Sequence, residues 1–188
     1  MGHPRRLKKK WMGPKKRWDK ERIIEEKKLM EDYGLKNKKE LWKAKTIIRK
    51  YRHLARSLVG LPEDERADKE KELLNKMRRM GLLSEDNLSL DAVLGLRVED
   101  LLERRLQTIV YKKGLARTIK QARQFIVHGH IRVGEKRIRS PGHIVTIEEE
   151  PLVDWYKEPI ITDTGEASVS SEAQEPSSQE SSQVVEHG

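Results

Sequence analysis

Residues 97–147 read RVEDLLERRLQTIVYKKGLARTIKQARQFIVHGHIRVGEKRIRSPGHIVTI, and this stretch decides the fold of the chain. Apolar residues recur at helical spacing over 98–110 and predict one continuous helix. Thr118 is a preferred N-cap residue, and Gln121 follows it at the spacing of a capping box. A second helix is therefore expected to begin after Thr118 and to end at Gly129.

The rest of this stretch has the pattern of strands. Apolar and polar residues alternate over 131–138 around Gly134-Glu135, a dipeptide suited to a two-residue hairpin turn. A turn at 140–142 then leads to an apolar run that predicts a further strand at 144–147. Two helices, a hairpin and one more strand predict an α+β fold with a small antiparallel sheet.

The sequence before this stretch is helical. Apolar residues at near-helical spacing predict helices over 20–33, 38–59 and 62–80, each followed by a glycine. Asn37 and Glu40 stand three positions apart before the second of these helices and predict a capping box.

The two ends of the chain differ from its middle in composition. Residues 1–20 combine Gly, Pro and like charges without a period, which is typical of an extended basic arm. Residues 82–96 are expected to form a loop with a short helical turn. The segment 159–188 is rich in Ser, Glu, Gln and Thr, and we expect an acidic, disordered tail.

The net charge of +9 conceals two strongly basic blocks. Residues 1–60 hold 21 basic and 7 acidic side chains, and residues 101–147 hold 11 and 2. Residues 61–100 and 148–188 are acidic, with 7 against 11 and 1 against 11. Basic blocks of this density indicate a polyanionic partner, and ordinary solvated helices would mix the two signs.

Aromatic and histidine residues leave two questions open. Trp11 and Trp18 in the basic arm could stack on nucleobases or could anchor the arm on the protein's own core. His128 and His130 could ligate a metal, but no third ligand lies near them in the sequence, and contact with a phosphate is the favoured interpretation.

The sequence offers no catalytic machinery. It has no phosphate-binding Gly loop, no nucleophile elbow and no cluster with metal-ligand spacing, so we predict no catalytic residue, cofactor or metal. It has no cysteine, which excludes disulfides and cysteine-based zinc sites. Because it also lacks an apolar run of about 20 residues and a secretory signal, we expect a cytoplasmic protein with no membrane or small-molecule partner.

Several short motifs in order resemble the alpha-L RNA-binding module. They are Arg105-Leu106, the Leu-Ala-Arg-Thr run at 115–118, Gln-Ala-Arg at 121–123 and His-Gly-His-Ile at 128–131. The stretch YGLKNKKELWKAKTIIRKYRHLARSL in the N-terminal half is similar to the archaeal and eukaryotic type of the small-subunit ribosomal protein four family. The resemblance covers about residues 1–158.

This resemblance implies a division into three parts: residues 1–96 as the arm and helical region, 97–158 as the alpha-L domain and 159–188 as the tail. It implies a structural constituent of the small ribosomal subunit that is not an enzyme. Such a protein binds the 16S-type ribosomal RNA first, nucleates assembly of the subunit body, contacts neighbouring ribosomal proteins and contributes to translational accuracy.

Two other functions were weighed against this one. A ribosome-biogenesis protein of the same family, acting on precursor ribosomal RNA, would share the module and a similar length. Pseudouridine synthases and tyrosyl-tRNA synthetases also carry alpha-L modules. The residues before position 97 are too few and too basic to form either catalytic domain.

Basic blocks and resemblance together give a set of candidate RNA-binding residues. We expect a double substitution, Arg105→Glu with Arg123→Glu, to weaken RNA binding and to leave the fold intact. The candidates in the module and in the N-terminal half are Arg104, Arg105, Arg117, Lys120, Gln121, Arg123, His128, His130, Arg132, Arg5, Arg6, Lys8, Lys9, Lys10, Lys45, Arg49 and Arg52.

Overall fold

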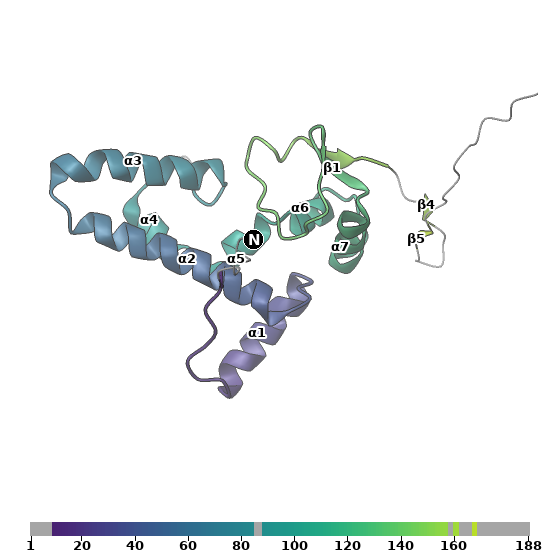
Figure 1. Ribbon diagram of the computed structural model, residues 1–188, viewed down its shortest axis with the longest axis horizontal. Coiled ribbons are helices and arrows are strands. Elements are labelled where there is room, and N and C mark those ends of the chain that lie inside the picture. The colour runs from purple at the N-terminus through teal and green to yellow at the C-terminus, as the bar shows by residue number, and fades with distance from the viewer. Residues whose placement is uncertain (1–8, 85–87, 158–159, 162–166, 169–188) are drawn as a thin grey trace, which may run out of the picture. The chain divides into compact units, whose positions relative to one another are not determined.

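The computed structural model describes residues 9–84, 88–157, 160–161 and 167–168 (Figure 1). The described residues between 9 and 157 belong to one compact unit. In the second unit, strands β4 (Ile160–Ile161) and β5 (Ala167–Ser168) pair antiparallel. The prediction of a disordered tail concerns mainly residues outside these ranges, and the four that are described lie in these two strands.

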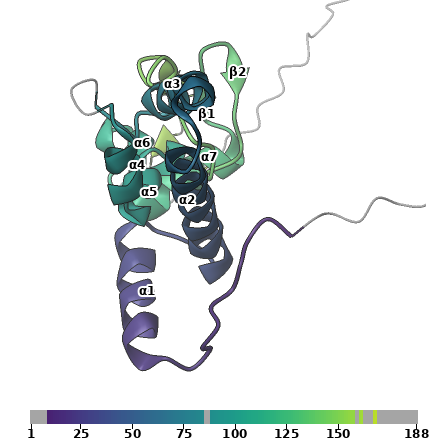
Figure 2. The ribbon, with the colours of Figure 1, turned by 90° about the vertical axis from the view of Figure 1, so that its left-hand side faces the viewer.

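Three helices form the N-terminal half, close to the predicted bounds. They are α1 (Lys20–Asp32), α2 (Lys38–Val59) and α3 (Glu63–Arg79). α2 contacts the other two helices, and α1 projects away from the rest in both ribbon views (Figures 1 and 2). The buried side chains along α2 that form the core with α3 and the short helix α4 (Leu90–Gly95) are Leu41, Ala44, Ile48, Ala55 and Leu58.

The predicted capping box at the start of α2 is wrong. Asn37 is the N-cap residue in extended backbone, but its side chain accepts no capping hydrogen bond. The Glu40 side chain instead forms ion pairs with two arginines far along the chain. For the Glu40 side chain, charge attraction to two guanidinium groups outweighs the one hydrogen bond to the Asn37 backbone N–H that a capping box would give it.

The predicted helix over 98–110 is broken in two. α5 (Val98–Glu103) ends and α6 (Leu106–Lys112) begins around Arg105, whose backbone is extended with φ −73° and ψ 142°. Both helices bury the expected apolar residues, so the periodicity was read correctly and the interruption was missed. The break frees backbone groups that pair with a segment of the chain about 40 residues later.

That later segment, residues 143–147, is where the predicted strand is wrong. Leu106 N donates to His143 O at 2.8 Å, Val145 N donates to Arg104 O at 2.9 Å, and Ile147 N donates to Arg79 O at 3.0 Å. Apart from an isolated bridge between Arg105 and Ile144, the segment pairs with helix ends and not with a neighbouring strand. Of its apolar residues, Val145 is buried and Ile144 is partly buried, whereas Ile147 is 47% exposed.

The third strand lies further on. β1 (Ile131–Val133) pairs antiparallel with β2 (Lys136–Arg137) on one side and with β3 (Val153–Trp155) on the other. The hairpin around Gly134 is confirmed, and so is an α+β module with a small antiparallel sheet. β3 has only three residues, too few for an alternating pattern to be recognised.

Helix α7 (Ile119–His128) packs against α6 and begins and ends where the sequence predicted. Thr118 Oγ1 accepts a hydrogen bond from Gln121 N at 3.1 Å. Gln121 Oε1 accepts from Arg117 N at 2.8 Å, one residue earlier than a standard capping box. Gly129 ends the helix in the left-handed region with φ 80°.

Replacing Gly129 with alanine should lower the free energy of unfolding by about 1–3 kcal/mol, the usual cost of a strained backbone residue. A Cβ at this position would also collide with the guanidinium group of Arg137, which hydrogen-bonds the carbonyl oxygens of Gly129 and His128. Urea denaturation would measure the change. Gly95→Ala is the matched control because a Cβ there meets no atom within 4 Å. Equal stabilities of the two variants would contradict the prediction.

Candidate nucleic-acid interface

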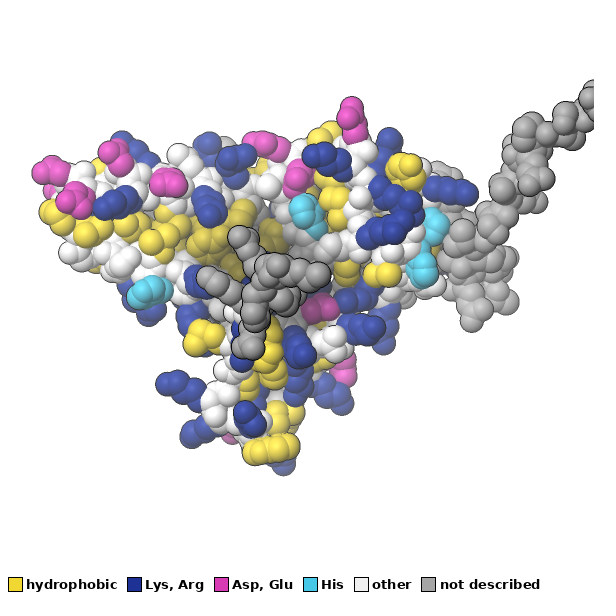
Figure 3. All heavy atoms as spheres, viewed as in Figure 1, with side chains coloured by type: hydrophobic (Ala, Val, Ile, Leu, Met, Phe, Trp, Pro, Cys, Tyr) yellow, Lys and Arg dark blue, Asp and Glu magenta, His cyan; other side chains and the backbone are white. Residues whose placement is uncertain are grey.

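The basic side chains predicted to bind RNA divide into two groups, one bound inside the protein and one exposed. Figure 3 shows Lys and Arg side chains spread over the face where α1, α2 and the alpha-L module lie. Asp and Glu gather at the end of α3 that holds its first turn, where the helix dipole favours them. The charges of α3 are therefore arranged to stabilise the helix itself, with acidic residues in its first turn and basic residues in its last turn.

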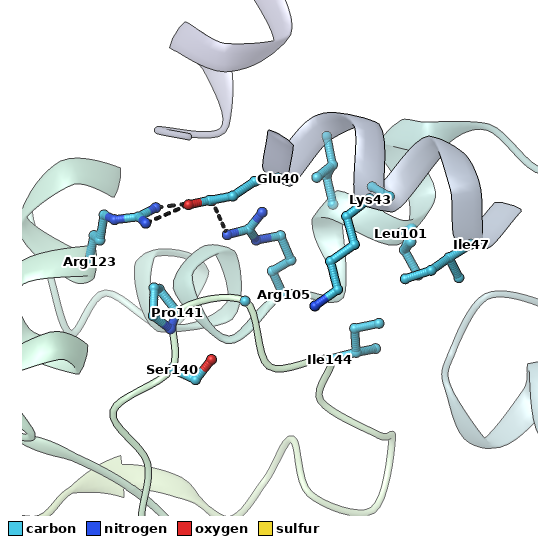
Figure 4. A pocket seen from close by; sticks show the side chains of 12 residues that line it. Glu40, Lys43, Ile47, Leu101, Arg105, Arg123, Ser140, Pro141 and Ile144 are labelled. Carbon is cyan, nitrogen blue, oxygen red and sulfur yellow. Dashed lines mark hydrogen bonds and ion pairs between the residues drawn. The ribbon is translucent and has the colours of Figure 1, made fainter. Parts of the chain in front are cut away.

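Glu40 of α2 binds two of the predicted arginines. Its Oε1 lies 2.6 Å from Arg123 Nη2, and its Oε2 lies 2.8 Å from Arg105 Nη2 (Figure 4). The Arg105 side chain is only 8% exposed, and the other two are less than one quarter exposed. One carboxylate from the N-terminal half thus joins two guanidinium groups of the module.

The electrostatics of this cluster favour the ion pairs. Burial alone would raise the pKa of Glu40, but hydrogen bonds from Arg123 and Arg105 outweigh it and hold the pKa below its ordinary value. The carboxylate is therefore charged at neutral pH. The cluster lines a cavity of about 330 Å³, into which Lys43 also extends (Figure 4).

Two further predicted residues also have partners inside the protein. Arg104 pairs with Glu150 at 2.7 Å and donates to the carbonyl oxygen of Val145 at 3.1 Å. His130 is 6% exposed, and its Nδ1 lies 3.0 Å from the carbonyl oxygen of Lys157. These contacts leave both side chains poorly placed to reach a partner molecule.

These positions change the expectation for the double substitution. Arg105→Glu with Arg123→Glu would place three carboxylates together where the structure has one carboxylate between two guanidinium groups. We now expect that variant to destabilise the fold, so it cannot serve as a test of RNA binding.

Apart from Gln121, which is partly buried and accepts a hydrogen bond from Arg117 N, the remaining predicted residues of the module are exposed. Arg117 and Lys120 flank the start of α7, and His128 lies at its end. Arg132 forms only an exposed pair with Asp154 at 3.2 Å, a kind of pair that contributes little stability. Arg117 and Lys120 have no acidic partner among the residues that the structure describes.

In the N-terminal half, two of the predicted residues have partners inside the protein and a third is exposed. Lys45 pairs with Glu26 at 3.1 Å, and Arg52 donates to the carbonyl oxygen of Leu96. Arg49 is exposed beside the sulfur of Met12.

The basic arm is described only in part. Lys9 and Lys10 are exposed, whereas Arg5, Arg6 and Lys8 lie outside the described residues. The Lys9 ammonium lies 4.0 Å from the ring centroid of Trp11.

Sequence reasoning missed two features of this surface. Glu40 was assigned to a helix cap, although it is the last acid before a long run of basic residues, and that isolation could have indicated a role in charge pairing. The sequence does not separate stacking from anchoring for Trp18, and the structure shows that its side chain is 90% exposed.

The structure also bears on metals and membranes. Within residues 9–84 and 88–157 and the two short strands, no three His, Cys, Asp or Glu side chains lie together as a metal site would require. No helix in the described part of the chain is both long and apolar enough to cross a bilayer.

Comparisons with known proteins divide the chain into two regions. The family model described as "Ribosomal protein S4/S9 N-terminal domain" matches residues 2–103, and the one described as "S4 domain" matches residues 104–150. A protein of Sulfurisphaera tokodaii named "Small ribosomal subunit protein uS4" is 57% identical over 156 residues, which cover 83% of this chain and 88% of the relative.

Two other relatives carry the same printed name. The protein of Metallosphaera sedula is 56% identical, with 83% of this chain and 87% of the relative covered. The protein of Saccharolobus solfataricus is 56% identical, with 83% and 86% covered. With a family model over more than half of its length and relatives at this identity, the chain belongs to the uS4 family of small ribosomal subunit proteins.

Proposed function

We propose that the protein is a structural constituent of the small ribosomal subunit that binds the ribosomal RNA of that subunit directly. The observation that carries this proposal is the exposed basic surface at the start of α7, within the part of the chain similar to an S4 domain. The printed names of the relatives support the assignment of the protein to the small ribosomal subunit. A ribosome-biogenesis protein acting on precursor RNA is not favoured, since the relatives are named as subunit proteins.

Residues 97–158 act, in this proposal, as the RNA-binding module. Arg117 and Lys120 pair with phosphates beside the positive end of the α7 dipole, while His128 and Arg132 extend the contact along the module. RNA helices of the A form hide their base edges in a deep groove, so the module reads shape through phosphates and 2′-hydroxyls.

In this proposal, the predicted arginines that have partners inside the protein act by positioning the module. Arg105 and Arg123 position the module against α2 through Glu40, and Arg104 positions the loop that holds Val145 and Glu150. They shape the surface that RNA meets, and the exposed cations make the contacts.

The finer parts of the proposal follow from the family. The protein binds early, promotes assembly of the subunit body, lies beside other ribosomal proteins on cytoplasmic ribosomes and influences translational accuracy. Its role is structural and not catalytic.

Sedimentation of a cell lysate on a sucrose gradient tests this proposal. The protein should sediment with mature small subunits and with translating ribosomes. Sedimentation with precursor particles alone would identify a biogenesis protein, and a peak at the top of the gradient would contradict the proposed partner. Purified protein should bind small-subunit RNA with an affinity that falls steeply as salt rises, because each phosphate contact releases counterions.

A further inference from the structure

Trp18 stands apart from the other tryptophans of the protein. Its side chain is 90% exposed, whereas Trp11, Trp42 and Trp155 are half-buried. Trp11 packs on Trp42 with ring centroids 5.3 Å apart and so anchors the arm to α2. Trp155 packs against Phe125 in the module core. The two tryptophans of the arm therefore have different roles, one as an anchor and one directed to solvent.

The turn that presents Trp18 is held by Arg22, which also pairs with a buried carboxylate. Arg22 of α1 donates to the carbonyl oxygens of Lys16 at 3.1 Å and Arg17 at 3.0 Å. The same guanidinium group pairs with Glu26 at 2.8 Å. These bonds fix the backbone immediately before Trp18, so the indole lies on an ordered turn and not on a free chain end.

Glu26 is the centre of this network. It is 1% exposed and also accepts hydrogen bonds from Trp42 Nε1 and Lys45 Nζ, each at 3.1 Å. A buried carboxylate with three donors ties the turn, α1 and α2 together. A buried charged residue, which is costly without partners, thus helps to hold a turn whose Trp18 side chain is 90% exposed.

The surroundings of Trp18 are basic. Within three residues of it, the exposed basic side chains of Lys15, Lys16, Arg17 and Lys20 outnumber the two acidic ones, Asp19 and Glu21. An apolar protein surface would have to desolvate these charges in order to cover the indole. A nucleic acid offers a partner to the basic side chains and to the indole alike, because its phosphates pair with the cations while a base stacks on the ring.

We propose that Trp18 stacks on an unpaired nucleobase of the ribosomal RNA, with the phosphates on either side of that base paired to Lys15, Lys16 and Arg17. The inference rests on the proposed function and deepens it. It assigns the arm a contact with a single-stranded or looped nucleotide, distinct from the shape recognition proposed for the module.

Fluorescence of the full chain tests the stack directly. Trp18→Phe is used as a blank, so that the difference between wild type and variant reports the emission of Trp18 alone. Twelve-nucleotide oligoadenylate should quench this emission, and an abasic oligonucleotide of the same length and charge should not. Equal quenching by both probes, or by neither, would overturn the proposal.

Affinity for transcribed small-subunit RNA gives the second measurement. Trp18→Ala should bind about tenfold more weakly, the usual effect of losing a stacked base, and Trp18→Phe should recover most of that loss. Leu152→Ala is the matched control, since Leu152 is also a large exposed apolar side chain but follows the acidic run Glu148–Glu150. Its affinity should equal that of wild type.

The outcomes separate this inference from the proposed function. If wild-type protein fails to bind the RNA, the proposed function fails. If wild type binds and Trp18→Ala binds equally well, only the stack is wrong. If Trp18→Ala lowers incorporation into subunits while RNA leaves the emission of Trp18 unchanged, the indole contacts a protein and the inference is overturned. Circular dichroism should be the same for all variants because the side chain is exposed.

Discussion

Replacing Glu40 with alanine is expected to destabilise the protein by about 3 kcal/mol at neutral pH, the lower end of the cost of leaving buried charges unpaired. Arg105 and Arg123 would lose their shared carboxylate, and Arg105 has little access to water that could compensate. Urea denaturation at pH 7 measures the loss. Glu65→Ala is a matched control, because Glu65 pairs with Lys69 at 3.3 Å on α3 with both side chains more than half exposed, and this pair should contribute less than about 1 kcal/mol.

The stabilising effect of Glu40 should also depend on pH. Its pKa is lower in the folded protein than the ordinary value of 4.5. A carboxyl group with a lowered folded pKa stabilises the fold above its unfolded pKa and loses this effect as the pH falls through the folded pKa. The difference in stability between wild type and Glu40→Ala should therefore be full at pH 7 and shrink below about pH 4. A difference that is small at pH 7, or constant with pH, would contradict the ion-pair account.

Reversing the charge of Arg117 and Lys120 together is expected to weaken binding to small-subunit RNA by about 100-fold. Two phosphate contacts are lost, and two carboxylates then face the RNA. The slope of log affinity against log salt should fall by about two, since each lost phosphate contact removes close to one released counterion. Filter binding at several salt concentrations measures both quantities.

The control for that experiment must change net charge by the same amount elsewhere. Lys71→Glu with Arg78→Glu meets this condition, because both residues are exposed on α3, where acidic side chains already balance the basic ones. Its affinity should stay within about threefold of wild type, because screening limits the reach of a distant surface charge. Equal losses in the two variants would mean that net charge alone, and not the surface at α7, determines binding.

Local sequence signals predicted most of the fold. These signals are the caps at Thr118 and Gly129, the glycine after each N-terminal helix and the turn at Gly134. Each of them depends only on residues that lie close together in the sequence. The break at Arg105 and the path of residues 143–147 depend on hydrogen bonds between segments about 40 to 70 residues apart, so no local pattern could reveal them.

The candidate site was predictable in composition but not in detail. Counts of basic residues located the two charged blocks. They could not separate Arg117, which is exposed, from Arg105, which is buried, because the partner of Arg105 lies 65 residues earlier in the chain. For the same reason, Glu40 was assigned to the nearest helix cap and not to the arginines it binds.

The hydrogen bonds made by residues 143–147 have a consequence for biosynthesis. The carbonyl groups of Arg79 and Arg104 leave the ribosome well before Ile147 and Val145, their partners in the folded protein. Until those residues have been synthesised, the carbonyls must be hydrated and the buried side chain of Val145 is missing from the core. A nascent chain that stops before residue 147 should therefore remain sensitive to proteases, and the full module should become resistant only in a late, cooperative step.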